Sequence, residues 1–175
     1  MRIHSESVIR HPLEAVYDAY RNQLSEVAAY IPDIREIRVH KKSEFEGGAE
    51  IHNEWISDSK MPRGIDRIVR PEHLRWDDYA QWDDSQHWVD WKIQTKVFTD
   101  AVECSGRNRF VAFGQSTKVI LEGNLEIEIS DIPGVPRILG KRLKPKIERF
   151  IVKLVTPNLK RVNECLQDYL DSKEG

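Results

Sequence analysis

The C-terminal part of the chain carries one long apolar stripe. Its members follow one another at steps of three or four residues: Leu143, Ile147, Phe150, Ile151, Leu154, Val155, Leu159, Val162, Leu166, Tyr169 and Leu170. This spacing places them on one face of a single amphipathic helix, which we expect from about Pro145 to Tyr169, after a helical turn over 137–143. Pro157 removes a backbone hydrogen bond inside this helix, so a kink is expected near Val155.

The residues from Ile34 to Ile129 follow a different period, because apolar and polar side chains alternate there. Alternation is typical of half-buried strands, and it predicts six strands after a first strand over Ile3–Ile9. Two short helices, over 12–24 and 25–30, should lie between the first strand and the others, with Ser25 as a candidate cap of the second helix. The segment 65–69 is compatible with either a helix or a strand.

The connections between the predicted strands are short, so successive strands should pair as an antiparallel meander. Glu46-Gly47-Gly48 supplies the glycines of a hairpin turn, and residues 132–136 should end the sheet. The predicted fold class is therefore α+β. A curved antiparallel sheet of about seven strands carries two short N-terminal helices, and the long C-terminal helix packs across it.

Length and charge limit the classes of function. A chain of 175 residues fits one domain spanning 1–175, and its net charge of −2 favours neither nucleic acid nor an anionic membrane as partner. The sequence contains no stretch apolar enough for stable membrane insertion and no secretory signal. Cys104 and Cys165 lie far apart, which favours reduced thiols. We expect a soluble, unprocessed cytoplasmic protein.

Two stretches resemble a known superfamily. Residues Val8–Tyr17, VIRHPLEAVY, are similar to the strand-to-helix opening of helix-grip proteins. Residues Leu121–Ile129, LEGNLEIEI, followed by 133–136, PGVP, and the terminal helix resemble a bacterial subgroup without assigned function. The whole chain resembles the START and polyketide cyclase-like (SRPBCC) helix-grip superfamily, which also includes pollen-allergen-type proteins.

The resemblance implies an internal cavity between the sheet and the terminal helix that holds an apolar or amphipathic small molecule. Members of the superfamily include carriers, sensors and a minority of enzymes, so the fold does not choose between these functions. A cavity of several hundred cubic ångströms, the usual size of small-molecule pockets, is expected if the chain binds such a ligand. A filled interior would contradict that function.

Three tryptophans, Trp55, Trp76 and Trp91, fall on the predicted inner face of the sheet. They could line a cavity, although packing in the core is the commoner role of such residues. Asn53 and Asp78 are polar positions on the same face. A carboxylate there could act as an acid or base, whereas a structural hydrogen bond is the more frequent role. The other candidate ligand-binding residues are apolar: Phe110, Leu121, Ile147, Ile151 and Leu154.

Other chemistries find no support in the sequence. The six histidines lack metal-ligand spacing, and there is neither a G-x-S-x-G motif nor a phosphate-binding loop, so we expect no metal and no cofactor. The basic cluster Lys141-Arg142-Lys144-Lys146 could meet an acidic headgroup during ligand loading, but a solvated helix face is the simpler interpretation. Trp82 and Trp88 lie near a predicted turn and could be exposed on a partner surface.

Three hypotheses follow from these residues. The first is a module that binds a hydrophobic small molecule for carriage, sensing or sequestration. The second is a cofactor-free cyclase, aromatase or dehydratase that uses Asp78 as acid or base on a polyketide-like substrate. The third is a protein interaction module built on Trp82, Trp88 and the terminal helix, with an unknown protein partner. The absence of a visible acid–base pair places the enzyme second.

Overall fold

The computed structural model describes residues 1–61, 63–67, 69–129, 135 and 137–174. Seven strands form one antiparallel sheet in the order β1-β7-β6-β5-β4-β3-β2. The strands are β1 (Arg2–Ile9), β2 (Ile34–Phe45), β3 (Gly48–Ser57), β4 (Arg75–Asp83), β5 (Trp88–Thr95), β6 (Val102–Phe113) and β7 (Ser116–Ile127). The predicted number of strands and the predicted meander are both confirmed. β1 closes the order by pairing with β7, so the two strands that flank the short helices lie at opposite edges.

The edge strand β2 is irregular. Its register against β3 shifts between Ile34 and Glu36 and again between Val39 and Lys41. Such bulges bend a strand and increase its twist, which helps the sheet to curve toward the helix that covers it. The hairpin between the two strands turns at Gly47, whose φ of 83° is the left-handed conformation that glycine adopts without strain.

The short helices are α1 (Leu13–Asn22), α2 (Leu24–Val27) and the 3₁₀ turn η1 (Ala28–Tyr30). The predicted capping role of Ser25 is wrong, because Gln23 occupies the position before α2 and makes no side-chain cap. α2 begins almost directly after α1, so Ser25 already lies inside the helix. The chain then becomes extended at Ile31, as the following proline predicts.

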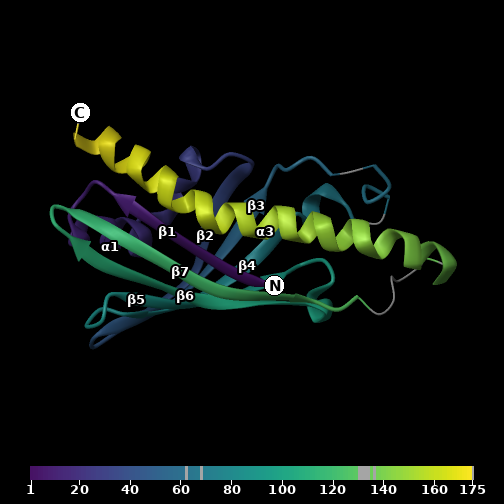
Figure 1. Cartoon of the computed structure of the whole chain (residues 1–175), viewed down its shortest axis with the longest axis horizontal. Helices are drawn as coiled ribbons and strands as arrows, with labels where there is room; N and C mark the ends of the chain where they lie inside the picture. The colour runs from purple at the N-terminus through teal and green to yellow at the C-terminus, as the bar shows by residue number, and fades with distance from the viewer. Residues whose placement is uncertain (62, 68, 130–134, 136, 175) are drawn as a thin grey trace.

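The long helix α3 (Arg137–Glu174) runs along the sheet as one continuous element (Figure 1). It starts eight residues before the predicted start at Pro145. The carbonyl that this proline leaves without a helical partner belongs to Lys141, which is exposed, so water can replace the lost bond. α3 also continues through Pro157, and the kink near Val155 stays a prediction. None of the described helices is long and apolar enough to cross a membrane.

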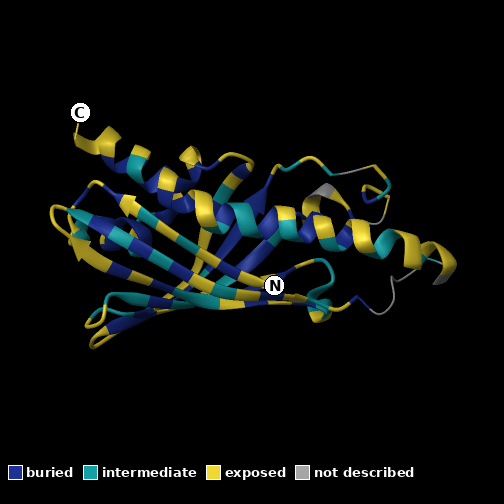
Figure 2. Cartoon of the chain, in the orientation of Figure 1, coloured by how far each residue is buried: buried dark blue, intermediate teal, exposed yellow. Residues whose placement is uncertain are grey.

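The predicted apolar stripe packs against the sheet. Figure 2 shows buried residues on the side of α3 that faces the strands and exposed residues on the other side. Nine members of the stripe are buried, namely Ile147, Phe150, Ile151, Leu154, Val155, Val162, Leu166, Tyr169 and Leu170, while Leu143 and Leu159 are partly buried. The helix and the sheet therefore share one hydrophobic core.

The segment 65–69, between β3 and β4, is neither a helix nor a strand where it is described, and the 3₁₀ turn η2 (Pro71–His73) follows it. Residues 63–67 form turns, and Ile65 and Val69 insert their side chains into the core. Two apolar residues four positions apart thus anchor an irregular loop in the core. The same spacing is compatible with a helix or a strand, so it does not identify a regular element. Pro62 and Ile68 lie outside the described residues, as do 132–134 and Pro136 of the segment predicted to end the sheet.

Candidate functional site

A small cavity lies between the inner face of the sheet and α3. Its lining comes from the short helices (Tyr20, Leu24), from β3 to β5 (Asn53, Trp55, Trp76, Asp78, Ala80, Trp82, Val89, Trp91, Ile93) and from α3 (Val155, Asn158, Leu159, Val162). The centres of water-sized molecules can occupy about 30 Å³ of it. That is room for one or two waters. The expected several hundred cubic ångströms are therefore not open in this structure.

Aromatic rings form most of the cavity wall. Alternation along β4 turns Trp76, Asp78 and Trp82 to the same inner face. The rings of Trp55 and Trp76, which are opposite each other in the β3–β4 ladder, stack with centroids 5.7 Å apart. At the other end of β4, Trp82 packs edge-on against the ring of Tyr20 at 5.9 Å. The wall thus offers flat apolar surfaces on more than one side.

Two glycines make room for the indole of Trp91. Trp91 pairs with Gly106 across the β5–β6 ladder, and Gly106 pairs with Gly123 of β7. A Cβ atom on Gly106 would lie 2.4 Å from the Trp91 Cζ2 atom, and one on Gly123 would lie 2.7 Å from Cη2. Real atoms do not approach so closely, so the indole can lie over these strands only because both positions lack a side chain.

A chain of hydrogen bonds joins the sheet to α1. Trp91 Nε1 donates to Asn108 Oδ1 at 3.0 Å, and Asn108 Nδ2 donates to the Tyr20 hydroxyl oxygen, also at 3.0 Å. The Tyr20 oxygen accepts this hydrogen bond, so the hydroxyl proton of Tyr20 remains available for another partner. No acceptor for it occurs among the described residues. Burial, with a smaller effect from Asp78, raises the pKa of Tyr20 and keeps it protonated. The cavity therefore holds an oriented O–H donor.

Two more donors in the cavity wall are unpaired. The indole nitrogens of Trp55 and Trp82 are buried, and neither has a hydrogen-bond partner within the part of the chain that the structure describes. Buried polar groups normally have partners, and leaving one without costs about 1–3 kcal/mol. Unpaired donors beside an enclosed space indicate that a water or a ligand atom occupies it.

Asp78 is the carboxylate of the cavity lining. Asn53 Nδ2 donates to its Oδ2 at 3.4 Å, and the N–H of Trp55 lies close but outside hydrogen-bonding geometry. Burial raises the pKa of Asp78 to about 6, against smaller lowering effects of these two neighbours. Although Asp78 is only half-buried by surface area, the surface it retains faces the cavity. A carboxylate with this pKa can take up and release a proton near neutral pH.

The opposite face of β4 has different electrostatics. Asp77, the neighbour of Asp78 in sequence, points outward and is bonded by Lys96 Nζ and by His52 Nε2, the latter at 2.9 Å. Burial alone would raise the pKa of Asp77, but these two partners lower it below its usual range. Adjacent aspartates thus have pKa values shifted in opposite directions, because one faces an apolar cavity and the other faces cations.

The turn of α3 that covers the cavity contains a proline. Pro157 has no N–H and so omits one helical hydrogen bond. In the same turn, Asn158 Nδ2 donates to the Leu154 carbonyl at 2.7 Å, and the buried Thr156 Oγ1 has no partner among the described residues. Asn158 itself lines the cavity. The turn above the cavity therefore holds fewer internal bonds than a regular helix does.

The predicted site residues divide into two groups. Asn53, Trp55, Trp76, Asp78 and Trp91 come together in the cavity wall. The other predicted residues are buried beside it: Phe110 packs against Trp82, Leu121 and Ile147 belong to the core, and Ile151 and Leu154 line a second, smaller pocket.

The predicted exposure of Trp82 is wrong, since it is 4% exposed and lines the cavity. β4 continues through Asp83, so the alternation that begins at Trp76 also includes Trp82, and the turn follows later than predicted. Sequence reasoning also missed Tyr20, Asn108 and Asn158 as polar groups of the site. The position of Tyr20 on the apolar face of its helix was the only signal.

Trp88 lies on the outer face, half-buried, and the guanidinium of Arg107 covers its ring at 3.0 Å from the centroid. Without Trp82, the proposed pair of exposed tryptophans does not exist. Among the described residues, no three or more His, Cys, Asp or Glu side chains are grouped so that they could hold a metal ion. Cys104 and Cys165 are buried and unbridged, as the sequence predicted.

The arrangement of one curved sheet, two short helices and a long covering helix is found in solved structures. TTHA0849 from Thermus thermophilus matches with a TM-score of 0.69 at 18% identity, over 100% of both chains. The ZhuI aromatase/cyclase from Streptomyces sp. R1128 matches with a TM-score of 0.59 at 12% identity, over 97% of this chain and 95% of that one. Norcoclaurine synthase from Thalictrum flavum has a TM-score of 0.55 at 10% identity, over 97% and 86%.

These likenesses define the class of protein at the level of fold, which is an α+β helix-grip protein. More particularly, it is the fold of the aromatase/cyclase and of the norcoclaurine synthase, which agrees with the fold that the sequence resemblance implies. No protein-family model and no curated protein matches the sequence. Two of these neighbours are named as enzymes and the name of the third states no activity, so the fold alone does not decide the function.

Proposed function

We propose that this protein binds an amphipathic small molecule, of the lipid or polyketide type, in the cavity between the sheet and α3, for carriage, sensing or sequestration. The observation that carries this proposal is the pair of buried indole N–H groups of Trp55 and Trp82 in an aromatic wall, for which the described residues supply no hydrogen-bond partner. An ordinary core fills its interior with apolar side chains and leaves few donors unpaired. A binding site instead leaves polar groups ready to orient a ligand.

The donors specify the chemistry of the ligand. Trp55, Trp82 and Tyr20 each have a proton to donate, so the ligand should present acceptor oxygens, such as carbonyl groups. The stacked rings of Trp55 and Trp76 favour a flat apolar body. A conjugated molecule with several carbonyl oxygens meets both requirements. The likeness of the fold to an aromatase/cyclase supports the same class of molecule.

A ligand of the proposed kind is too large for the cavity as it stands, so the site has to open for the ligand to bind. Ligand pockets usually measure about 300–1,000 Å³, far more than the 30 Å³ found between sheet and helix. The turn of α3 around Pro157 covers the cavity and lacks one helical hydrogen bond, so it can move at a lower cost than a turn of a regular helix. We infer that the structure is the closed form and that ligand binding displaces this turn.

Conservative tryptophan variants test the proposal. The purified protein is first analysed by native mass spectrometry for bound molecules, and then titrated with a hydroxyanthraquinone while tryptophan fluorescence is recorded. Trp55→Phe and Trp82→Phe keep an aromatic ring but lose the N–H. Each should weaken binding by about fivefold, since a hydrogen bond contributes about 1 kcal/mol. Trp88→Phe, on the outer face, is the matched control and should bind like the wild type. Absence of saturable binding, or equal affinity in all variants, would contradict the proposal.

A second candidate function rests on Asp78. Its raised pKa and the nearby hydroxyl of Tyr20 fit a cofactor-free cyclase, aromatase or dehydratase. The carboxylate would remove a proton from a carbon beside a carbonyl group, and the Tyr20 O–H would stabilise the resulting enolate oxygen. Asp78→Asn separates the two functions. An enzyme should lose turnover of a poly-β-ketone substrate and keep its affinity, whereas a carrier shows no turnover with either residue.

A further inference from the structure

The first turns of α3 expose apolar side chains away from the core. Ile138 is 79% exposed and Leu139 is 53% exposed, and Ile138 is the most exposed large apolar residue among those described. Figures 1 and 2 show that this end of the helix extends past the sheet and that its described residues are exposed or intermediate. Among the described residues, α3 packs against the core from Leu143 onward, so Ile138 and Leu139 lie before the part of the helix that the core holds.

The same turns are strongly basic. Residues 137–149 contain six Lys or Arg residues and one acidic residue, Glu148. Within the described part of the chain, no ion pair involves Lys141, Arg142, Lys144, Lys146 or Arg149. By contrast, Arg107 and Arg109 on the outer face of β6 are paired with acidic residues. No acidic side chain of the described residues therefore competes with an external anion for the cations at the start of α3.

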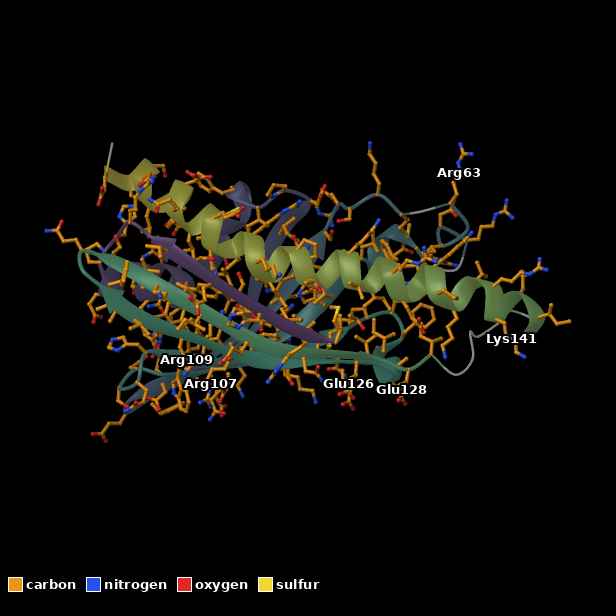
Figure 3. The ribbon with its side chains drawn as sticks, in the orientation of Figure 1. Arg63, Arg107, Arg109, Glu126, Glu128 and Lys141 are labelled. Atoms are coloured by element: carbon orange, nitrogen blue, oxygen red, sulfur yellow. The ribbon has the colours of Figure 1, made fainter. Side chains whose placement is uncertain are left out.

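The charges at this end of the molecule are separated by side. Figure 3 shows Lys141 at the start of α3 and Arg63 on the helix side of the molecule, whereas Glu126 and Glu128 point away from the helix on the other side of the sheet. An anionic surface would attract Lys141 and Arg63 and repel Glu126 and Glu128. Approach from one direction is thus favoured.

We propose that the start of α3 docks on the surface of an anionic lipid membrane. Ile138, Arg142 and Arg149 follow at steps of four and seven residues, so they share the helix face opposite the core. Lys and Arg side chains near an anionic bilayer contribute about 1 kcal/mol each, and apolar side chains between them enter the headgroup region. This docking lies on the surface rather than across the bilayer.

Other partners fit the patch less well. A nucleic acid would use the positive charge but leave the exposed Ile138 and Leu139 without a role. A second copy of the chain, meeting the same face, would bring two sets of unpaired cations together. A membrane that is anionic outside and apolar just beneath meets both properties. The docking does not depend on a ligand in the cavity, so it can hold even if the proposed binding function fails.

Vesicle sedimentation of the full chain tests the docking. The protein is mixed with sucrose-loaded vesicles of phosphatidylcholine alone, or with about one third phosphatidylserine, at about 0.1 M and about 0.5 M salt. It should sediment with the phosphatidylserine vesicles at low salt, and this binding should fall steeply at high salt. Failure to bind these vesicles at low salt would overturn the proposal, whatever the variants do.

Charge-matched variants locate the contact. Lys141→Gln with Arg142→Gln should lower vesicle affinity about 30-fold, since two charges contribute about 2 kcal/mol. Arg107→Gln with Arg109→Gln removes the same charge elsewhere and should bind like the wild type. An equal loss in both pairs would mean that net charge alone causes the binding, which contradicts a specific contact.

The apolar part of the contact is tested separately. Ile138→Ser with Leu139→Ser should weaken vesicle binding about tenfold or more, because the buried methylene groups contribute about 0.8 kcal/mol each, while the salt dependence remains. These side chains are exposed, so circular dichroism should show unchanged folding. Unchanged vesicle affinity, together with tighter binding of duplex DNA at the same salt concentration, would assign the patch to a nucleic acid instead.

Discussion

Asp78→Asn should stabilise the protein at neutral pH. Burial raises the pKa of Asp78 from 3.8 to about 6, so the folded state opposes ionisation of this carboxyl group. At 1.36 kcal/mol for each unit of pKa, ionisation costs the fold about 3 kcal/mol once the pH exceeds 6. Asparagine resembles the neutral acid in size and polarity and can still accept from Asn53. The variant avoids the cost of burying a charge.

The sign of the pH dependence follows from proton binding. Between about pH 4 and pH 6 the folded state keeps the proton on Asp78 while the unfolded state releases it, so the stability due to this group falls as the pH rises. The free energy of unfolding should therefore be similar in wild type and Asp78→Asn below about pH 4. Above about pH 6 the variant should be more stable by about 3 kcal/mol.

Urea unfolding followed by tryptophan fluorescence, repeated across this pH range, measures the difference. Taking the difference between the two proteins cancels the carboxylates that they share. Asp77→Asn is the matched control, because Lys96 and His52 lower the pKa of Asp77 despite its burial. This control should be less stable than wild type at neutral pH, and the deficit should shrink as Asp77 of the wild type becomes protonated.

A constant difference between wild type and Asp78→Asn from about pH 4 to pH 7 would refute the reasoning. It would mean that the carboxylate is as well solvated in the fold as in the unfolded chain. The cavity would then be open to bulk water, and the proposal of a closed site covered by α3 would fail with it.

Three further outcomes are expected. Gly106→Ala should destabilise the fold by about 1–3 kcal/mol, because its Cβ would overlap the indole of Trp91. Gly140→Ala should instead stabilise the fold by about 0.5–1 kcal/mol, because a Cβ there meets no atom within 4 Å. Thermal unfolding measures both changes. Tyr20→Phe should cost about 1–3 kcal/mol in urea unfolding, since it leaves the buried amide of Asn108 without its acceptor; no loss would show that water replaces the hydroxyl. The thiols of Cys104 and Cys165 should react with Ellman's reagent only in denaturant, because burial raises the pKa of Cys104 to about 12 and also raises the pKa of Cys165. Rapid labelling of the native protein would contradict this.

Much of the fold could be predicted because the signals are local. The steps of three and four residues along α3 and the alternation along β4 and β5 each state which side chains share a face. For this reason Trp55, Trp76 and Trp91 could be placed on the inner face from the sequence. The errors occurred at boundaries. α3 begins at Arg137 and not at the predicted start Pro145, and β4 continues to Asp83, so Trp82 lies in the strand and not at the predicted turn.

The candidate site was only partly predictable, because it joins residues with no common pattern. Tyr20 comes from α1, Asn108 from β6 and Asp78 from β4, and the hydrogen bonds and charge effects among them arise only after the strands pair and the helix packs. Nothing in the sequence near Asn108 indicates that its amide connects an indole to a phenol. The roles of Gly106 and Gly123 are equally invisible, since they depend on a ring from a neighbouring strand.

The apolar stripe of the terminal helix and the alternating strands were determined by the sequence itself, because the direction of a side chain follows from the local backbone period. The sequence also determined that aromatic rings and Asp78 share the inner face. Only the tertiary structure decided how far those rings fill the space between the sheet and α3, where about 30 Å³ remains. It also decided which buried donors have no partner among the described residues. Cavity volume and pKa depend on the side chains that several elements bring together, and no single segment of the chain contains that information.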